Sequence, residues 1–203
     1  MSKAEQSNKQ YSDNQLKCLL EAAIFSASAP QSITLLQETV LAEYQLSNAK
    51  VRELLDALQS DYAERGVQLQ SSASGYRFVT ALEWAEPLQK VGQHHAPKYS
   101  RALLETLVLI AYQQPITRGE IEKVRGVSVS SKSIQTLMER GWVRVVGHKQ
   151  VPGRPALLAT TKTFLDYFGL NSLSELPQLS DQAAVQALLS TREGHNEPES
   201  VNE

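Results

Sequence analysis

The first half of the chain spaces its apolar positions as amphipathic helices do. Apolar residues at i, i+3, i+4, i+7 and i+8 mark the inward face of a first helix: Leu16, Leu19, Leu20, Ala23 and Ile24. Ser12 and Gln15 have the spacing of a capping box that begins this helix, and Pro30 places its end before that residue. Cys18 is expected to be a buried, inert thiol, because leucines surround it and the sequence indicates no His, Asp or Asn partner.

Two more helices and two strands are predicted in this half. Thr34 and Gln37 form a second capping box, which predicts a helix to about Tyr44, and Ser47 begins a third helix that Gly66 closes. The inward face of this third helix is expected to contain Val51, Leu54, Leu55, Leu58 and Tyr62. The runs VQLQ and YRFVTAL then read as strands on either side of residues 71–75, which is typical of a hairpin.

The second half repeats this order of elements. Its first helix should end before Pro115, and its inward residues are Leu103, Leu104, Leu107, Val108 and Ala111. Thr117 and Glu120 form a capping box. A third helix closes at Gly141, and its inward residues are Ile134, Leu137 and Met138. The runs WVRVVGHK and ALLATT follow as strands, with the turn VPGRP between them.

Helix, short strand, helix, helix, strand, turn, strand is the element order of a winged helix, and the order occurs twice. The predicted fold is therefore mainly α with small β-sheets (α+β), in two tandem winged-helix (helix-turn-helix) domains. The expected divisions are a flexible N-terminus (1–12), an N-terminal domain (13–91), a linker (92–100), a C-terminal domain (101–177) and an acidic, disordered tail (178–203).

Residues Leu109 and Ile110 widen the apolar arc of the helix before Pro115 beyond what one three-helix face uses. Two explanations stay open at this point. The surplus indicates either contact with another domain or chain, or a helix buried at the centre of its own domain.

The charge distribution and the absence of catalytic motifs indicate a binding protein. The net charge is −2, but residues 13–97 carry −4 and residues 98–175 carry +5. The sequence contains no phosphate-binding Gly-rich loop, no GxSxG and no metal-spaced His/Cys set. No catalytic, cofactor-binding or metal-binding residue is predicted, and an enzyme is not expected. Neither a membrane span nor a signal peptide is predicted, so a cytoplasmic protein is expected.

The charges of the third helix in each half separate DNA reading from protein binding. Residues 47–66 carry a net charge of −1, with acidic residues at the outward positions, and phosphates would repel such a helix. In the second half, the basic residues lie more in the strands and turn than in the helix. Three interpretations of this basic edge stay open. It makes a weak, non-specific contact with DNA, it is simply solvated, or it is a surface for an acidic partner.

Three motifs in the chain resemble the bacterial segregation and condensation protein B (ScpB) family. They are YQQPITRGEIEKVRGV (112–127), VPGRP (151–155) and TTKTFLDYFGLNSLSELP (160–177). The resemblance covers about residues 14–177 and is strongest from Leu103 to Pro177. It implies two winged-helix domains and a homodimer formed mainly through the N-terminal domain. It also implies binding to the kleisin ScpA, which bridges the heads of the SMC ATPase.

The chain would then be a non-enzymatic, nucleoid-associated accessory subunit for chromosome condensation, segregation and partition in cell division. Arg118, Arg125 and Arg154 are the candidates for partner contact, because the fold alone explains them less readily than the capping and turn residues. The alternative is a winged-helix transcription regulator that binds operator DNA. Its candidate contacts to the DNA backbone are Lys132, Arg140, Arg144 and Lys149.

The chain departs from the family pattern at three places. His148 stands where the family pattern has an Arg. The anion contact expected of that Arg is therefore in doubt in this chain, because a His side chain is largely uncharged at neutral pH. Leu158 and Ala159 replace a Tyr-Gly pair. Gly119 replaces an Ala, at a cost to the helix of ~1 kcal/mol.

Overall fold

Helix α1 (Asp13–Ser26) begins at the predicted capping box. In the computed structural model, which describes residues 11–89 and 99–178, the Ser12 N–H donates to Gln15 Oε1 at 2.9 Å and the Gln15 N–H donates to Ser12 Oγ at 3.3 Å. The predicted inward residues are buried or partly buried. The expectation of a buried Cys18 was wrong, because this residue is exposed. It lies two positions after Leu16, and so on the opposite side of the helix.

Helix α2 (Ile33–Glu38) differs from the prediction at both ends. Ser32, not Thr34, is its N-cap and accepts the Leu35 N–H at 3.1 Å. The helix does not reach Tyr44, because Thr39 leaves the helical region with φ −113° and ψ −93°. The chain then turns so that Leu41, like Leu36, is 1% exposed in the core.

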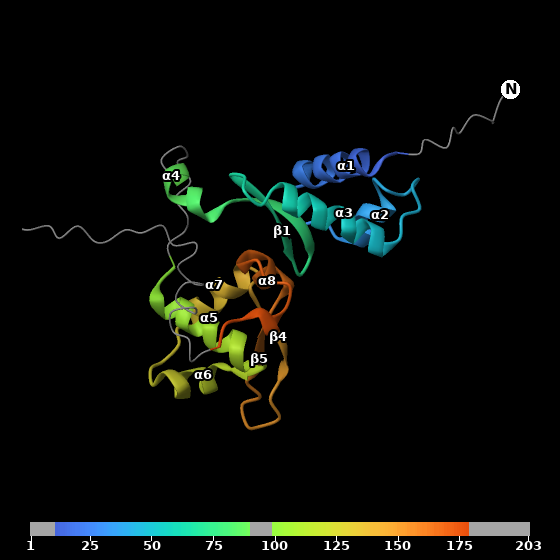
Figure 1. Ribbon diagram of the computed structural model, residues 1–203. Helices are drawn as coiled ribbons and strands as arrows, with labels where there is room; N and C mark the ends of the chain where they lie inside the picture. The colour runs from blue at the N-terminus through green and yellow to red at the C-terminus, as the bar shows by residue number, and fades with distance from the viewer. Residues whose placement is uncertain (1–10, 90–98, 179–203) are drawn as a thin grey trace, which may run out of the picture. The chain divides into compact units, whose positions relative to one another are not determined.

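Helix α3 (Asn48–Asp61) carries the predicted buried row, and Ser47 caps it. It ends before Gly66, and turns fill the interval. Strands β1 (Val67–Ser72) and β2 (Gly75–Thr80) form the predicted antiparallel hairpin. A single bridge between Gln31 and Tyr76 adds a third segment to the hairpin. Figure 1 labels α3 and β1. The 3₁₀ turn η1 (Leu82–Trp84) and helix α4 (Ala85–Gln89) follow the hairpin, and the sequence reading did not predict them.

Residue contacts divide the chain into two units, Met1–Ala81 and Leu82–Glu203. The second unit contains α5 (Arg101–Gln113), β3 (Ile116–Thr117), α6 (Arg118–Arg125) and α7 (Ser131–Glu139). It continues with β4 (Val143–His148), β5 (Ala156–Thr160), α8 (Lys162–Phe168) and η2 (Leu173–Glu175). The three strands form an antiparallel sheet in the order β3-β5-β4, with a bulge between Val145 and Gly147. The sequence reading missed α8 and η2.

Helix α5 lies at the centre of the second unit's core. Ile110 is fully buried, and Leu109 packs against the same cluster as β5, α7 and α8. Leu109 and Ile110, which widen the apolar arc of this helix, therefore pack largely within the unit, as the explanation of a centrally buried helix requires. Trp142 is 2% exposed and contacts the rings of Tyr99, Tyr167 and Phe168. The prediction of an inward Met138 was wrong, because this residue is 42% exposed.

The helices and the two small sheets confirm an α+β protein. The predicted flexible N-terminus and acidic tail lie almost wholly outside the described residues, as do residues 92–98 of the predicted linker. Within residues 11–89 and 99–178, no helix combines the length and the apolar character needed to cross a bilayer.

Candidate partner-binding surface

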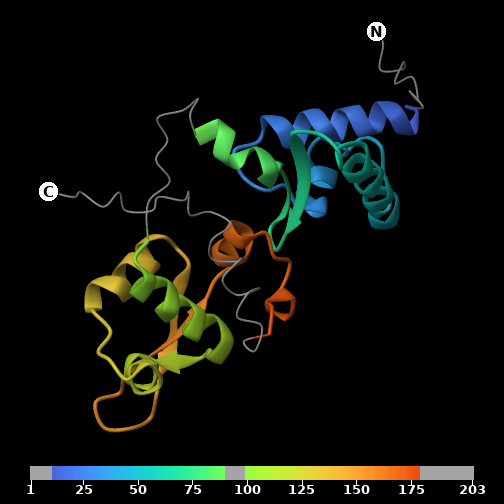
Figure 2. The ribbon, with the colours of Figure 1, turned by 60° about the vertical axis from the view of Figure 1, so that its left-hand side comes forward.

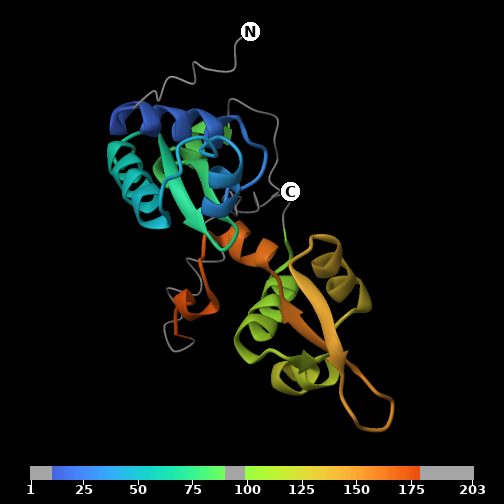
Figure 3. The ribbon, with the colours of Figure 1, turned by 90° about the vertical axis from the view of Figure 1, so that its right-hand side faces the viewer.

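The loop that carries VPGRP is bonded through Lys149 to the first turn of α6, which lies in the motif PITRGE. The Glu120 carboxylate accepts the Thr117 N–H at 2.9 Å and the Thr117 hydroxyl at 2.7 Å, which completes the predicted capping box. Its other oxygen, Oε1, accepts a hydrogen bond from Lys149 Nζ. Lys149 opens the loop between β4 and β5 (residues 149–155, the β4–β5 loop), which extends past α6 in Figure 3. One carboxylate therefore ties this loop to the start of α6.

The electrostatic environment of Glu120 makes this junction sensitive to acid. The hydrogen bond from Lys149, followed by those from Thr117, lowers the pKa of Glu120 from 4.5 to about 2. A carboxyl group whose pKa falls on folding stabilises the folded state above its unfolded pKa. This contribution is lost as the pH falls from 4.5 towards 2.

Glu120→Gln should remove this pH-dependent contribution while keeping the cap, because a Gln side chain can accept the same backbone N–H. Urea unfolding at several pH values should show the wild type more stable than the variant at pH 7. The difference should shrink between pH 4.5 and pH 2, the window set by the two pKa values. Lys149→Met should reproduce most of the loss, and parallel stability curves for wild type and Glu120→Gln would contradict the assignment.

Arg118 connects α6 to α7. Its Nε donates to Glu122 Oε1 at 2.9 Å, and its Nη1 donates to Ser131 Oγ at 2.8 Å. The same Glu122 oxygen accepts the Val129 N–H at 2.9 Å, so Arg118 and Glu122 together fix the turn between the two helices. The Val129 and Arg118 hydrogen bonds lower the pKa of Glu122. The Arg118 side chain is still 46% exposed, so it can also face a partner.

Arg125 is turned into its own unit. Its side chain is 11% exposed, and Nη2 donates to Glu105 Oε2 at 2.9 Å. Nη1 donates to the hydroxyl of Thr106 at 3.2 Å, and Thr106 is fully buried in α5. Hydrogen bonds from Arg101 and Arg125 lower the pKa of Glu105. Arg125 therefore joins the last turn of α6 to the middle of α5.

Arg154 lies on the exposed β4–β5 loop. Gly153 has a φ of +82° and Arg154 itself a φ of +38°, so the loop makes the tight turn that the sequence predicts. The Arg154 N–H donates to the Val151 carbonyl and the Lys149 N–H donates to the Pro155 carbonyl, each at 2.9 Å. Among the described residues, the Arg154 guanidinium has no ion-pair partner.

The residues considered for DNA have different surroundings. Lys132 and Arg144 are exposed and form no ion pair within residues 11–89 and 99–178. The Arg140 guanidinium lies 5.6 Å from the centre of the Tyr99 ring. Lys149 is engaged by Glu120. In the first unit, Lys50 of α3 forms ion pairs with Asp13 and Glu53. The acidic outward positions of α3 are exposed, as expected.

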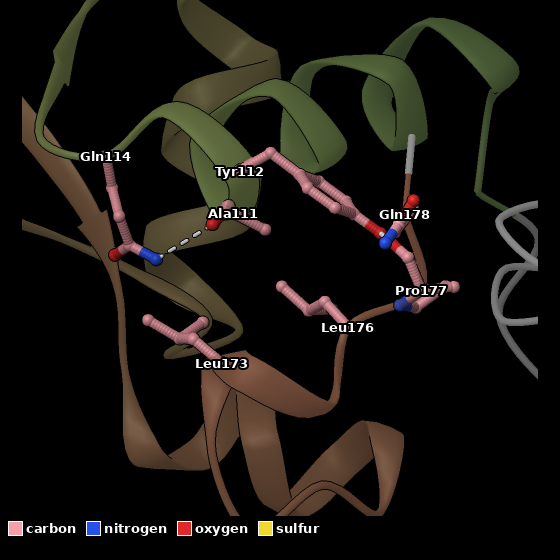
Figure 4. Close-up of a pocket in the computed structure, with 7 residues that line it drawn as sticks. All are labelled: Ala111, Tyr112, Gln114, Leu173, Leu176, Pro177 and Gln178. Atoms are coloured by element: carbon pink, nitrogen blue, oxygen red, sulfur yellow. Dashed lines mark hydrogen bonds between the residues drawn. The ribbon is translucent and has the colours of Figure 1, made fainter. Parts of the chain in front are cut away.

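A groove that the sequence reading missed lies between α5 and the end of the described chain. Figure 4 shows Tyr112 and Leu176 on its walls. The volume of the groove is about 520 Å³. The Tyr112 hydroxyl donates to the Pro177 carbonyl, which holds the segment after η2 against α5. Gln114 also lines the groove, but its side-chain amide is already hydrogen-bonded to the Ala111 carbonyl and to the N–H and hydroxyl of Thr160. Tyr112 and Pro177 are far apart in sequence, and no local pattern indicates their contact.

The described part of the chain holds no cluster of His, Cys, Asp or Glu suited to a metal ion.

Residues 18–179 match the model of the family described as "Segregation and condensation complex subunit ScpB". A segregation and condensation protein B homolog of Coxiella burnetii is 52% identical over 165 residues, which cover 81% of this chain and 79% of that protein. A segregation and condensation protein B of Moorella thermoacetica is 44% identical over 178 residues, 87% of this chain and 88% of that protein.

Solved structures are also similar in sequence. A crystal structure of a conserved hypothetical protein from Chlorobium tepidum is 36% identical, and the match covers 78% of this chain and 98% of that one, with a TM-score of 0.36. The crystal structure of ScpB from Mycobacterium tuberculosis is 30% identical, and the match covers 79% of this chain and 99% of that one, with a TM-score of 0.36.

Proposed function

Because the chain belongs to the ScpB family of segregation and condensation proteins, we propose that it is a non-enzymatic accessory subunit of a bacterial SMC–kleisin complex. In this role it binds the kleisin ScpA, and through ScpA the SMC ATPase, in chromosome condensation, segregation and partition during cell division. The observation that carries the proposal is the family match over residues 18–179, which includes both units. The proposed location is the cytoplasm, at the nucleoid.

The proposal includes two tandem winged-helix domains, residues 13–91 and 101–177, and a homodimer formed mainly through the first. Each unit supplies the required order of helix, bridging segment, two helices and hairpin. The bridging segment is Gln31 in the first unit and Ile116–Thr117 in the second. The acidic outward face of α3 supports protein binding over groove reading in the first domain.

We place the kleisin contact on the second domain, at the junction of α6 and the β4–β5 loop. Arg154 and Arg118 are its proposed contact residues, because both are accessible and the Glu120–Lys149 and Arg118–Ser131 bonds hold the surrounding elements together. Arg125 supports this surface from inside the unit through Glu105 and Thr106. A partner segment with acidic side chains fits two accessible guanidinium groups.

Arg154→Glu should weaken ScpA binding by about 10-fold or more, because it places like charges across the contact. The circular dichroism melt should be unchanged, since Arg154 is exposed and forms no ion pair among the described residues. Titration calorimetry with a ScpA fragment measures the affinity. Lys162→Glu is a matched control, because it reverses an exposed charge on α8. Equal affinities for wild type and Arg154→Glu would remove Arg154 from the contact.

The second candidate function is DNA binding by a winged-helix transcription regulator, and the exposed Lys132 and Arg144, which form no ion pair among the described residues, favour it. Salt separates the two functions. Binding driven by many phosphate contacts weakens by orders of magnitude between low and physiological salt, whereas a kleisin contact that includes only the two arginines should weaken far less. Strong, salt-sensitive binding to duplex DNA without any binding to a ScpA fragment would favour the regulator.

A further inference from the structure

The groove beside α5 is suited to apolar side chains. None of the described residues that line it is charged. Tyr112 and Leu176 are half-buried, and Leu173 is 40% exposed. The Tyr112 hydroxyl and the Gln114 amide already have hydrogen-bond partners within the second unit. Apolar side chains that enter the groove therefore leave neither of these polar groups without a partner.

The chain itself leads into this groove. The hydrogen bond from Tyr112 to the Pro177 carbonyl holds the last described residues against α5. Gln178, the last of them, lines the groove. Figure 2 shows η2 in orange-red below α8, close to the point where the coloured ribbon ends. The segment that follows Gln178 is therefore attached at the groove, and a short attachment gives an effective concentration on the order of 1 mM.

The sequence of residues 179–190, LSDQAAVQALLS, is typical of a short amphipathic helix. The segment contains one charged residue, Asp181, and the next acidic residue is Glu193. Its larger apolar residues have the i, i+3, i+4 spacing of one helix face: Val185, Leu188 and Leu189. Its polar residues recur at every fourth position: Gln182, Gln186 and Ser190. A helix this short is marginal in water by itself, so its apolar face needs a surface on which to pack.

We propose that residues 182–189 form a helix that packs Val185, Leu188 and Leu189 into the groove beside α5 of the same chain. Anchors at i, i+3 and i+4 are the pattern by which an amphipathic helix fills an apolar groove. The uncharged walls match an uncharged helix face, and the acidic residues from Glu193 onward stay outside the contact. Apolar surface of both the helix and the groove leaves water, so the segment stabilises the second unit.

The first test compares charges on the two faces of the segment in the full chain. Val185→Glu/Leu188→Glu should lower the unfolding temperature of the second unit by ~5 °C or more, because two carboxylates cannot enter the groove without losing their hydration. Gln182→Glu/Gln186→Glu is the matched control, because it adds the same charge to the opposite face, and it should leave this temperature nearly unchanged. Glutamate is a good helix former, so helix propensity does not explain a difference. Differential scanning calorimetry measures both variants.

The second test determines which face of the segment is covered. It uses a Cys18→Ser background, because Cys18 is the only cysteine in the sequence. Leu188→Cys should react with a thiol reagent at least ~10-fold more slowly than Gln186→Cys, since a covered thiol reacts only when the contact opens. The difference should not change on dilution, because the groove and the segment belong to one chain.

The outcomes separate the contact from its alternatives. A lowered unfolding temperature for Val185→Glu/Leu188→Glu together with slow reaction of Leu188→Cys would establish the contact. Equal unfolding temperatures for the two Glu pairs and equal reaction rates for the two thiols would overturn it. Protection of Leu188→Cys that disappears on dilution would overturn the assignment to the same chain, since a second copy would then supply the segment. Neither test involves ScpA, so the proposed function does not depend on the result.

Discussion

Gly75→Ala should unfold the first unit at temperatures where the second stays folded. A Cβ at this position would lie 2.2 Å from the Gln31 carbonyl oxygen and 2.6 Å from the Ser32 nitrogen. Gly75 also has a φ of +134°, which side chains rarely allow. Both conflicts are with the backbone, so no side-chain rotation relieves them. We expect a loss of about 4 kcal/mol or more in the free energy of unfolding of this unit.

The neighbouring backbone cannot retreat without breaking other bonds. Gln31 exchanges two hydrogen bonds with Tyr76, at 2.8 and 2.9 Å, and Ser32 caps α2. Moving this segment therefore loosens the hairpin and α2 together. Differential scanning calorimetry of the full chain should show one transition lowered and the other unchanged. A wild-type thermogram would mean that Gly75 does not pack against Gln31.

Gly119→Ala is the control of opposite sign. Gly119 lies in the first turn of α6, and a Cβ there would meet nothing within 4 Å. Alanine should therefore stabilise the second unit, by up to ~1 kcal/mol. The two glycines show that the same substitution has opposite effects when one backbone is crowded and the other open.

Local patterns predicted what depends on residues three or four positions apart. The capping boxes at Ser12 and Thr117 are present because their partners, Gln15 and Glu120, are close in sequence. The same rule misplaced α2, where Ser32 competes with Thr34 for the cap. Cys18 was misjudged because its leucine neighbours in the sequence lie on another side of the helix.

Contacts between distant segments could not be predicted. In the sequence, Gly75 indicates only a turn, and its closeness to Gln31 appears once the hairpin packs beside that segment. The link from Lys149 to Glu120 likewise depends on the path of the β4–β5 loop. Arg125 shows how this limits the prediction of the candidate site, because the sequence does not distinguish it from Arg118 and Arg154. Only the structure shows that Arg125 is hydrogen-bonded to Glu105 and Thr106 within its own unit.

Arg125→Glu should destabilise the second unit by about 3 kcal/mol or more. The new carboxylate would replace a guanidinium that is 11% exposed and would lie beside Glu105, whose charge would then repel it. Arg101 provides a matched control, because its Nε bonds the same Glu105 at 2.9 Å while its side chain is 94% exposed. Arg101→Gln should cost under ~1 kcal/mol, as expected for a surface pair. Urea unfolding of the full chain measures both.

The comparison of Arg125 with Arg154 separates folding from binding. If Arg125 acts through α5, then Arg125→Glu weakens ScpA binding only as far as it unfolds the second unit, and the folded fraction binds normally at low temperature. Arg154→Glu should show the reverse: its thermal unfolding should match that of the wild type, while its binding to ScpA is weak. Should Arg125→Glu keep the wild-type stability and still lose ScpA, the guanidinium would have to leave Glu105 and Thr106 to meet the partner directly.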